Sequence, residues 1–110
     1  MKTVFISQPI NGKSNEVIIE ERKKALEEVK IMLGEDVYTI PSFFNYSNIQ
    51  DIIGNVPLFY LSKSILMLSA ADVAYFAKGY ENARGCQIEF QCAKEYGLPY
   101  LTYHGDKGNF

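Results

Sequence analysis

Short apolar runs alternate with amphipathic stretches along the chain, and this order predicts an α/β fold. Four runs rich in β-branched and aromatic residues are bounded by turn formers and are expected to be strands: Thr3 to Ile6, Asp36 to Ile40, Asp72 to Ala77 and Pro99 to Tyr103. Three segments repeat apolar residues at helical spacing and predict helices: Asn15 to Leu33, Pro57 to Ser69 and Ala83 to Tyr96. Alternating strands and helices predict one domain, residues 1–110, with a parallel sheet and helices on both faces.

The last of these helices carries an acidic residue on its apolar side. Asn82 is its predicted N-cap, and Gly97 the left-handed residue after its last turn. Glu89 lies near the middle of an arc formed, at about 100° per residue, by Cys86, Phe90, Ala93 and Tyr96. A carboxylate facing a core needs a partner or a cleft. A structural Glu held by a neighbour and a functional acid therefore both remain open.

Composition excludes several classes of protein. The 110 residues are 47% apolar and 22% charged, which is ordinary for one globular domain, and the net charge of -2 gives no basic surface for a nucleic-acid polymer. No apolar run approaches the roughly 20 residues of a membrane span. Cys86 and Cys92 share a helix and cannot form a disulfide, so a cytoplasmic location is expected. Seven Phe and eight Tyr exceed the needs of a small core and indicate an oligomer interface or a stacking surface.

In a parallel sheet, ligands bind outside the carboxyl ends of the strands. Three loops are expected to meet there: Ser7 to Ser14, Ile40 to Asn45 within a long loop of residues 42–56, and Ala77 to Gly85, which delivers Glu89.

The first of these loops nearly matches the phosphate-binding pattern G-x-x-x-x-G-K-[ST]. Gly12, Lys13 and Ser14 fit the pattern, but Ser7 replaces its first Gly and Pro9 removes one amide. A tight turn whose amides contact a ligand is therefore favoured over a true P-loop.

Other polar residues leave alternatives open. Arg84 and Gly85 open a helix whose free amides favour anions, although Arg84 can instead pair with Glu81. Asp72 can be a site residue, cap the preceding turn or face solvent. His104, the sole His, is assigned no role, so no catalytic triad is visible, and no metal cluster is seen.

Three segments carry a resemblance that covers nearly the whole chain: Phe5 to Gly12, Ala71-Asp72 before an apolar strand, and Ala83 to Pro99. Together they resemble the nucleoside 2-deoxyribosyltransferase-like superfamily, and more closely a short bacterial and phage branch of it. The most specific part runs from Gly85 to Pro99, with Glu89 four residues after the Gly.

The resemblance implies a flavodoxin/Rossmann-like three-layer sandwich with a parallel sheet of four or five strands, and a site against the first-strand loop. In this superfamily the Glu at the position of Glu89 is a nucleophile that attacks C1′ of a 2′-deoxynucleoside and forms a deoxyribosyl ester. The residue matching Asp72 assists the leaving base, and Tyr80 or Tyr75 orients the nucleophile. No cofactor is implied.

The same resemblance implies that sugar and phosphate are held by Ser7, Gln8, Pro9, Gly12, Tyr80, Arg84 and Gly85. One departure is that the sugar-binding Asp expected six residues before the nucleophile is Ala83 here. The neighbouring cation of Arg84 favours a 5′-phosphate instead. A homo-oligomer is expected, with Asn109 and Phe110 reaching a neighbouring subunit's site.

These observations lead to three hypotheses. The first is an enzyme acting on the N-glycosidic bond of a small-molecule deoxynucleoside or its 5′-phosphate, with no nucleic-acid or membrane partner. The second is a non-catalytic binder of a nucleotide or nucleotide-derived signal, which the missing Asp at Ala83 motivates. The third is an interaction module using the aromatic segment Phe43 to Tyr46.

Overall fold

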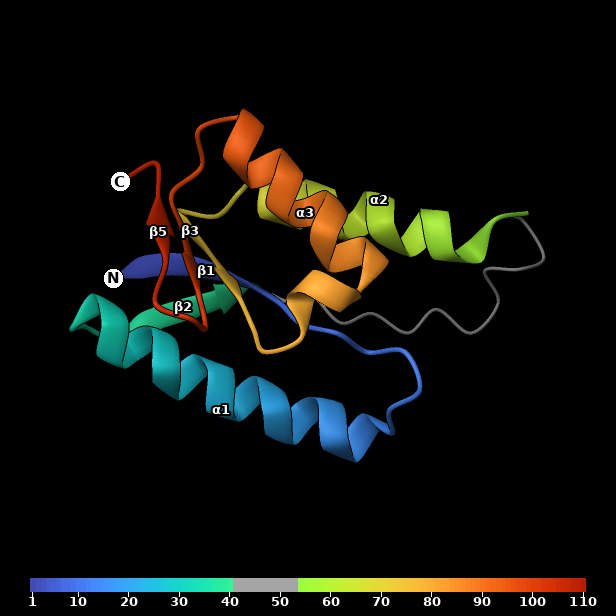
Figure 1. The fold of residues 1–110 in the computed structure, drawn as a ribbon, viewed down its shortest axis with the longest axis horizontal. Helices are drawn as coiled ribbons and strands as arrows, with labels where there is room; N and C mark the ends of the chain where they lie inside the picture. The colour runs from blue at the N-terminus through green and yellow to red at the C-terminus, as the bar shows by residue number, and fades with distance from the viewer. Residues whose placement is uncertain (41–53) are drawn as a thin grey trace.

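A five-stranded mixed sheet forms the centre of the computed structural model, which describes residues 1–40 and 54–110 (Figure 1). β1 pairs in parallel with β2 and β3, and β3 pairs in parallel with β4, whereas β5 runs antiparallel to β4. In spatial order the strands are β2 (Val37–Ile40), β1 (Lys2–Ser7), β3 (Val73–Phe76), β4 (Tyr100–Thr102) and β5 (Lys107–Gly108). The predicted α/β class is confirmed, but β5 makes the sheet mixed rather than parallel.

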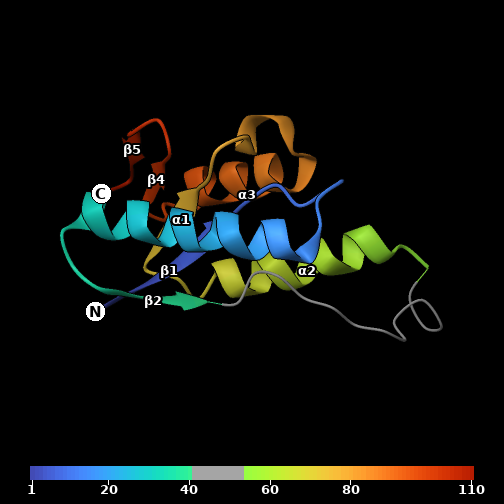
Figure 2. The ribbon, with the colours of Figure 1, turned by 90° about the horizontal axis from the view of Figure 1, so that it is seen from below.

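Helices cover the two faces of the sheet. α1 (Asn15–Leu33) packs on one face, while α2 (Val56–Leu68) and α3 (Arg84–Glu95) pack on the other (Figures 1 and 2). Alternation along β1 supplies both cores, because successive side chains point to opposite faces. Val4 and Ile6 join the α1 side, and Phe5 joins the α2 and α3 side.

The ends of α1 follow from local chemistry. The Ser14 side chain accepts a hydrogen bond from the backbone N–H of Val17 at 3.2 Å, which satisfies a free amide of the first turn. At the other end Gly34 has φ 69°, a left-handed conformation that Gly adopts without steric cost. The predicted bounds of this helix are confirmed.

The start of α3 differs from the prediction. Asn82 lies in a short 3-10 helix, Tyr80–Asn82, and the N-cap of α3 is Ala83, which has no capping side chain. Asn82 as the N-cap is therefore wrong. Tyr96 was expected on the buried side but is 89% exposed, because the helix ends at Glu95 and its periodicity stops there.

The carboxyl-terminal segment is tied to the fold. Lys107–Gly108 pairs with β4, and the side chain of Asn109 donates hydrogen bonds to the backbone oxygens of Ala93 at 3.2 Å and Leu98 at 3.1 Å. Asn109 thus caps the end of α3 in its own chain. Phe110 is 64% exposed, and the expectation that these two residues reach a neighbouring subunit's site stays a prediction.

α2 begins at Val56, one residue before the predicted start at Pro57, and ends at Leu68, one residue before the predicted end. Asn55 is its N-cap and accepts from the backbone N–H of Leu58 at 3.0 Å, and Pro57 lies in the first turn. The aromatic segment Phe43 to Tyr46 and the loop after Ile40 fall outside the described residues. Within the described ranges no helix combines the length and apolar character needed to cross a membrane.

Candidate functional site

Glu89 is buried at the carboxyl end of β1, where its carboxylate contacts hydroxyl groups from two other elements. The side chain is 7% exposed, and Ser7 Oγ donates a hydrogen bond to Glu89 Oε1 at 2.6 Å. The hydroxyl of Ser64, on α2, lies near enough to the carboxylate to lower its pKa. Within residues 1–40 and 54–110 no ion pair involves Glu89. β1, α2 and α3 therefore converge on one carboxyl group without a neutralising cation.

Burial dominates the electrostatics of this carboxyl group. Desolvation raises the pKa of Glu89 to about 7, and the hydrogen bonds from Ser7 and Ser64 only partly oppose it. The cause is that the apolar surroundings disfavour the charged form. Near neutral pH the group therefore exchanges readily between its protonated and ionised forms, a property suited to chemistry on a bound ligand.

A buried thiol lies beside the carboxyl group, one helical turn earlier on α3. Desolvation, followed by the nearby Glu89, raises the pKa of Cys86 to about 11, while Ser7 and Lys13 act in the opposite direction. Cys86 is therefore a neutral thiol at physiological pH and not a nucleophile, because the thiolate is the reactive form.

Ser64 was missed in the sequence. It is one of two buried residues on α2, with Leu68, and it is the polar one. The criterion that singled out Glu89, a polar group on the buried side of a helix, also applies to Ser64. An isolated Ser gives a weaker signal than a Glu because a hydroxyl can satisfy itself on its own helix backbone.

The first loop forms the expected tight turn rather than a P-loop. The backbone N–H of Lys13 donates to the oxygen of Ile10 at 3.2 Å, and Gly12 has φ 76°. Ser14 caps α1, and the Lys13 side chain pairs with Glu21 at 2.8 Å. The amide of Lys13 and the groups that a P-loop would turn toward phosphate are thus engaged within the chain.

Of the predicted ligand contacts in this loop, Ser7 donates a hydrogen bond to Glu89. Gln8 follows the alternation of β1 and donates through Nε2 to the backbone oxygen of Ile18 at 3.1 Å, so it lies against α1. Pro9 lies beside the loop after β3, since a Cβ atom at Gly79 would be 3.3 Å from its Cγ.

Tyr80 lies on the same sheet face as Glu89 but is packed into an aromatic cluster. Its ring centroid is 5.6 Å from that of Phe76 and 5.4 Å from that of Phe90. Burial raises the pKa of Tyr80. Tyr75, the alternative orienting residue, is wrong for this site, because its hydroxyl donates to Glu28 of α1 on the opposite face.

Arg84 is exposed as the first residue of α3, and Gly85 follows it. Glu81, the alternative partner of Arg84, instead interacts with His104 through Oε2 and Nε2 at 2.6 Å. This hydrogen bond lowers the pKa of Glu81. His104, to which no role was assigned, thus links the turn after β4 to the 3-10 helix that precedes α3.

Asp72 and Glu89 lie at opposite ends of the parallel strands. Its Oδ2 accepts from the backbone N–H of Thr3 at 2.8 Å, and its own N–H donates to the oxygen of Thr3. Thr3 and Ser7 are separated along β1 by roughly 13 Å at about 3.3 Å per residue. Asp72 precedes β3, which runs parallel to β1, so it lies at the amino ends of these strands, whereas Ser7 lies at the carboxyl end of β1. The structure therefore does not bring Asp72 to Glu89. Its expected role at the leaving base is therefore wrong.

We expect the substitution Asp72→Ala to lower the free energy of unfolding by about 1 kcal/mol, because it removes an exposed hydrogen bond from the backbone N–H of Thr3. Any activity that depends on Glu89 should remain within about twofold of wild type, since additivity holds for distant sites. Urea denaturation and steady-state rates measure the two effects. A loss of activity without a loss of stability would contradict this placement of Asp72.

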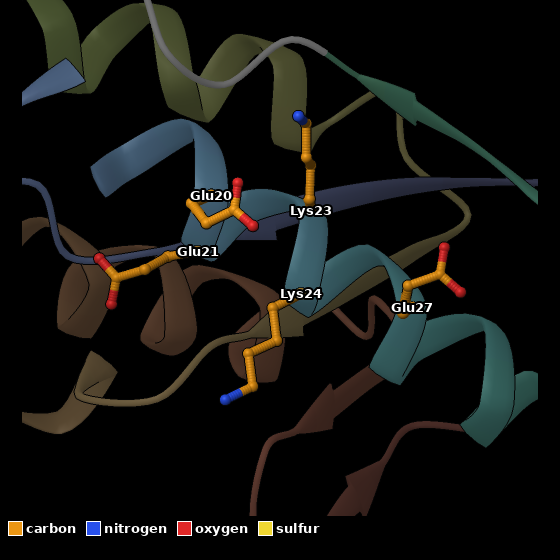
Figure 3. A pocket seen from close by; sticks show the side chains of 5 residues that line it. All are labelled: Glu20, Glu21, Lys23, Lys24 and Glu27. Atoms are coloured by element: carbon orange, nitrogen blue, oxygen red, sulfur yellow. The ribbon is translucent and has the colours of Figure 1, made fainter. Parts of the chain in front are cut away.

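A shallow surface depression lies away from Glu89, on the outward side of α1 (Figure 3). Its lining consists of five charged side chains from one helix: Glu20, Glu21, Lys23, Lys24 and Glu27. These side chains point in different directions in Figure 3 and do not converge on a common centre. Within the described residues, no group of three His, Cys, Asp or Glu side chains is arranged to hold a metal ion.

Comparison with protein-family models and with curated proteins finds no match. Among solved structures, the chain is similar to a conserved protein from Enterococcus faecalis V583, with a TM-score of 0.58 and 14% sequence identity. The likeness covers 93% of this chain and 62% of that one. At this identity it supports the α/β fold alone.

Proposed function

We propose that this chain cleaves or transfers the N-glycosidic bond of a 2′-deoxynucleoside or its 5′-phosphate, with Glu89 as the nucleophile. The observation that carries the proposal is the buried carboxyl group of Glu89, which accepts a hydrogen bond from Ser7 at the carboxyl end of β1 and lies near Ser64 of α2. Ligand sites of open α/β sheets lie at this edge. The sequence resemblance to the nucleoside 2-deoxyribosyltransferase-like superfamily supports the same residue and a flavodoxin-like three-layer arrangement.

The proposed reaction has two displacement steps. A carboxylate oxygen of Glu89 forms a bond to C1′ while the bond from C1′ to the base nitrogen breaks, and the base leaves with the bonding electrons and takes up a proton from solvent. Water or a second base then attacks C1′, breaks the ester and regenerates the carboxylate, with the proton of the attacking group lost to solvent. Both steps pass through an oxocarbenium-like sugar, as in retaining glycoside hydrolysis.

The electrostatics of Glu89 suit this role. An ionised carboxylate is costly in its buried position, which is why its pKa is raised to about 7. A sugar that develops positive charge at C1′ lowers that cost in the transition state more than in the ground state. Only interactions that strengthen in the transition state accelerate the reaction. Ser7 fixes the carboxylate by donating to Oε1.

We assign recognition of a 5′-phosphate to the amino end of α3. Arg84 is exposed there, and Glu81 interacts with His104. The first amides of a helix and its dipole favour an anion, and a guanidinium adds charge-assisted hydrogen bonds. Ala83, in place of an acidic sugar-binding residue, is compatible with an anionic ligand. We further propose that the protein acts in the cytoplasm as a homo-oligomer without a cofactor.

A non-catalytic nucleotide binder is the second candidate function, and the placement of Asp72 favours it. Retaining glycosidases use two carboxyl groups about 5 Å apart. The described buried polar residues are Ser7, Ser64, Glu89 and Thr102, so Glu89 is the single acid among them. A binder uses the same buried carboxyl group and needs no second acid.

We expect the wild-type protein to release free base from at least one 2′-deoxynucleoside 5′-monophosphate, as measured by chromatography. Arg84→Ala should raise KM for the monophosphate about tenfold or more, because it removes a charged contact, and leave KM for the unphosphorylated deoxynucleoside unchanged. Lys94→Ala, at the other end of α3, is the matched control. If no substrate yields free base while calorimetry shows mononucleotide binding, the binder replaces the enzyme.

A further inference from the structure

The single proton of the Ser7 hydroxyl is used in its hydrogen bond to Glu89. Ser7 is 2% exposed, and its Oγ donates to Glu89 Oε1 at 2.6 Å. This distance lies in the range of roughly 2.5 to 2.7 Å that is typical of a hydroxyl bonded to a charged oxygen. A hydroxyl has one donor, so Ser7 has none left for a sugar or a phosphate. The geometry therefore differs from the substrate contact that the sequence resemblance implies for Ser7.

Cys86 brings a second donor to this cluster. It lies three positions before Glu89 on α3, so the two side chains are neighbours on the helix surface, and both residues are buried. Ser7 lies near enough to the thiol to lower its pKa, but burial raises that pKa to about 11, so the thiol keeps its proton at physiological pH. A protonated thiol is a weak donor, and the Ser7 oxygen can accept a hydrogen bond while it donates its own.

The neighbours of Glu89 from the other packed elements are neutral. Ser64, from α2, lowers the pKa of Glu89 in the same direction as Ser7 does. Lys13, from the loop after β1, lowers the pKa of the Cys86 thiol, but its ammonium group forms an ion pair with Glu21 at 2.8 Å. Hydroxyl and thiol donors, rather than a cation, therefore determine how the carboxyl group is oriented.

From this arrangement we infer that Cys86 and Ser7 are positioning residues that act in series on Glu89. The thiol donates to Ser7 Oγ, which directs the Ser7 proton toward Glu89 Oε1 and holds the carboxylate in one orientation. Hydrogen bonds in series strengthen one another in a buried site. The inference rests on the proposed role of Glu89 as the nucleophile, and it assigns Ser7 to the nucleophile rather than to the substrate.

The substitution Ser7→Ala separates positioning from substrate binding. We expect it to lower kcat for base release about tenfold and to leave KM within about twofold, because the nucleophile loses its orientation while no substrate contact is lost. The pH midpoint of the Glu89 titration, followed by NMR of its carboxyl carbon, should rise by about half a pH unit or more, since a donor to the ionised form is removed. Thr102→Val is the matched control, because Thr102 is a buried hydroxyl residue in the same row across the sheet, bonded to Asp106.

Two substitutions at Cys86 test the thiol. Cys86→Ala removes the donor and should raise the Glu89 midpoint in the same direction as Ser7→Ala but by less, because the Ser7 hydroxyl can still donate. Cys86→Ser keeps a donor of similar size and should keep the wild-type midpoint. Equal midpoints in Cys86→Ala and the wild type would overturn the role of the thiol, and so would equal shifts in Cys86→Ala and Cys86→Ser.

The titration of Glu89 needs no turnover, so this inference and the proposed function can fail separately. Circular dichroism establishes that every variant is folded. A Ser7→Ala midpoint that is unchanged or lower overturns the inference, and so does a raised KM with wild-type kcat, which would make Ser7 a substrate contact. If the midpoints move as expected but the wild type releases no base from any substrate, the donor series is supported and the proposed reaction is overturned.

Discussion

The substitution Glu89→Gln is expected to lower kcat/KM for base release by on the order of 10³-fold or more, because it removes the attacking oxygen of the proposed reaction. Gln has nearly the shape of Glu and can still accept from Ser7, which now donates to Oε1 at 2.6 Å. The packing around α3 should therefore survive the change. The loss should fall mainly on kcat, since substrate contacts at Arg84 and Gly85 are untouched.

Glu95→Gln is the control for this measurement, because it makes the same chemical change on an exposed side chain of the same helix. The wild-type enzyme should also accumulate a sugar adduct on Glu89, detectable by intact-protein mass spectrometry after an acid quench. A Glu89→Gln variant that keeps the wild-type kcat would show that Glu89 is not the nucleophile.

The pH dependence of the wild-type reaction gives an independent measure of the same group. Because the ionised form attacks, kcat/KM should rise with pH and level off above the pKa of Glu89, which burial raises to about 7. An exposed carboxylate would instead level off near pH 4 to 5. A rate that falls as pH rises from 5 to 8 would indicate that the protonated form is required, and would contradict the role of nucleophile.

Local signals in the sequence predict much of the fold. The bounds of α1 follow from a capping Ser14 and a left-handed Gly34, both of which act within one helical turn. Glu89 was located in the same way, because a helix of known phase fixes which side chains point inward. Local pattern is informative here because caps and helix faces depend on residues close together in the chain.

The errors arise where the structure depends on contacts distant in sequence. β5 spans two residues and has no periodicity of its own, so its pairing with β4 and the contacts of Asn109 could not be predicted from composition. Asp72 was placed by motif, although a residue that precedes a parallel strand lies at the amino edge of the sheet. The burial of Ser64 could not be predicted, because the packing of α2 against α3 decides which side of α2 faces inward.

The same Glu89→Gln substitution is expected to raise the free energy of unfolding at pH 8 by about 3 kcal/mol. Glu89 has its pKa raised from 4.5 to about 7 in the folded protein, mainly by desolvation, and at about 1.4 kcal/mol per pH unit this difference corresponds to about 3 kcal/mol. Between pH 4.5 and about 7, the carboxyl group of Glu89 is protonated more in the folded state than in the unfolded state. The free energy of unfolding of the wild type therefore falls as pH rises through this range. Gln at position 89 is neutral, so the variant does not lose this stability.

Urea denaturation at pH 4 and pH 8, with Glu95→Gln as the control, measures this effect. The gain from Glu89→Gln should be large at pH 8 and nearly absent at pH 4, where Glu89 is protonated in both states. An equal gain at both pH values would assign it to packing rather than to ionisation, and no gain at pH 8 would mean that the carboxylate is well solvated. A buried acid that destabilises the fold at physiological pH is an expected cost of function, since stability is often lost where activity needs an unfavourable group. If Glu89→Gln both stabilises the protein and abolishes base release, one desolvated carboxylate explains the catalytic result and the stability result.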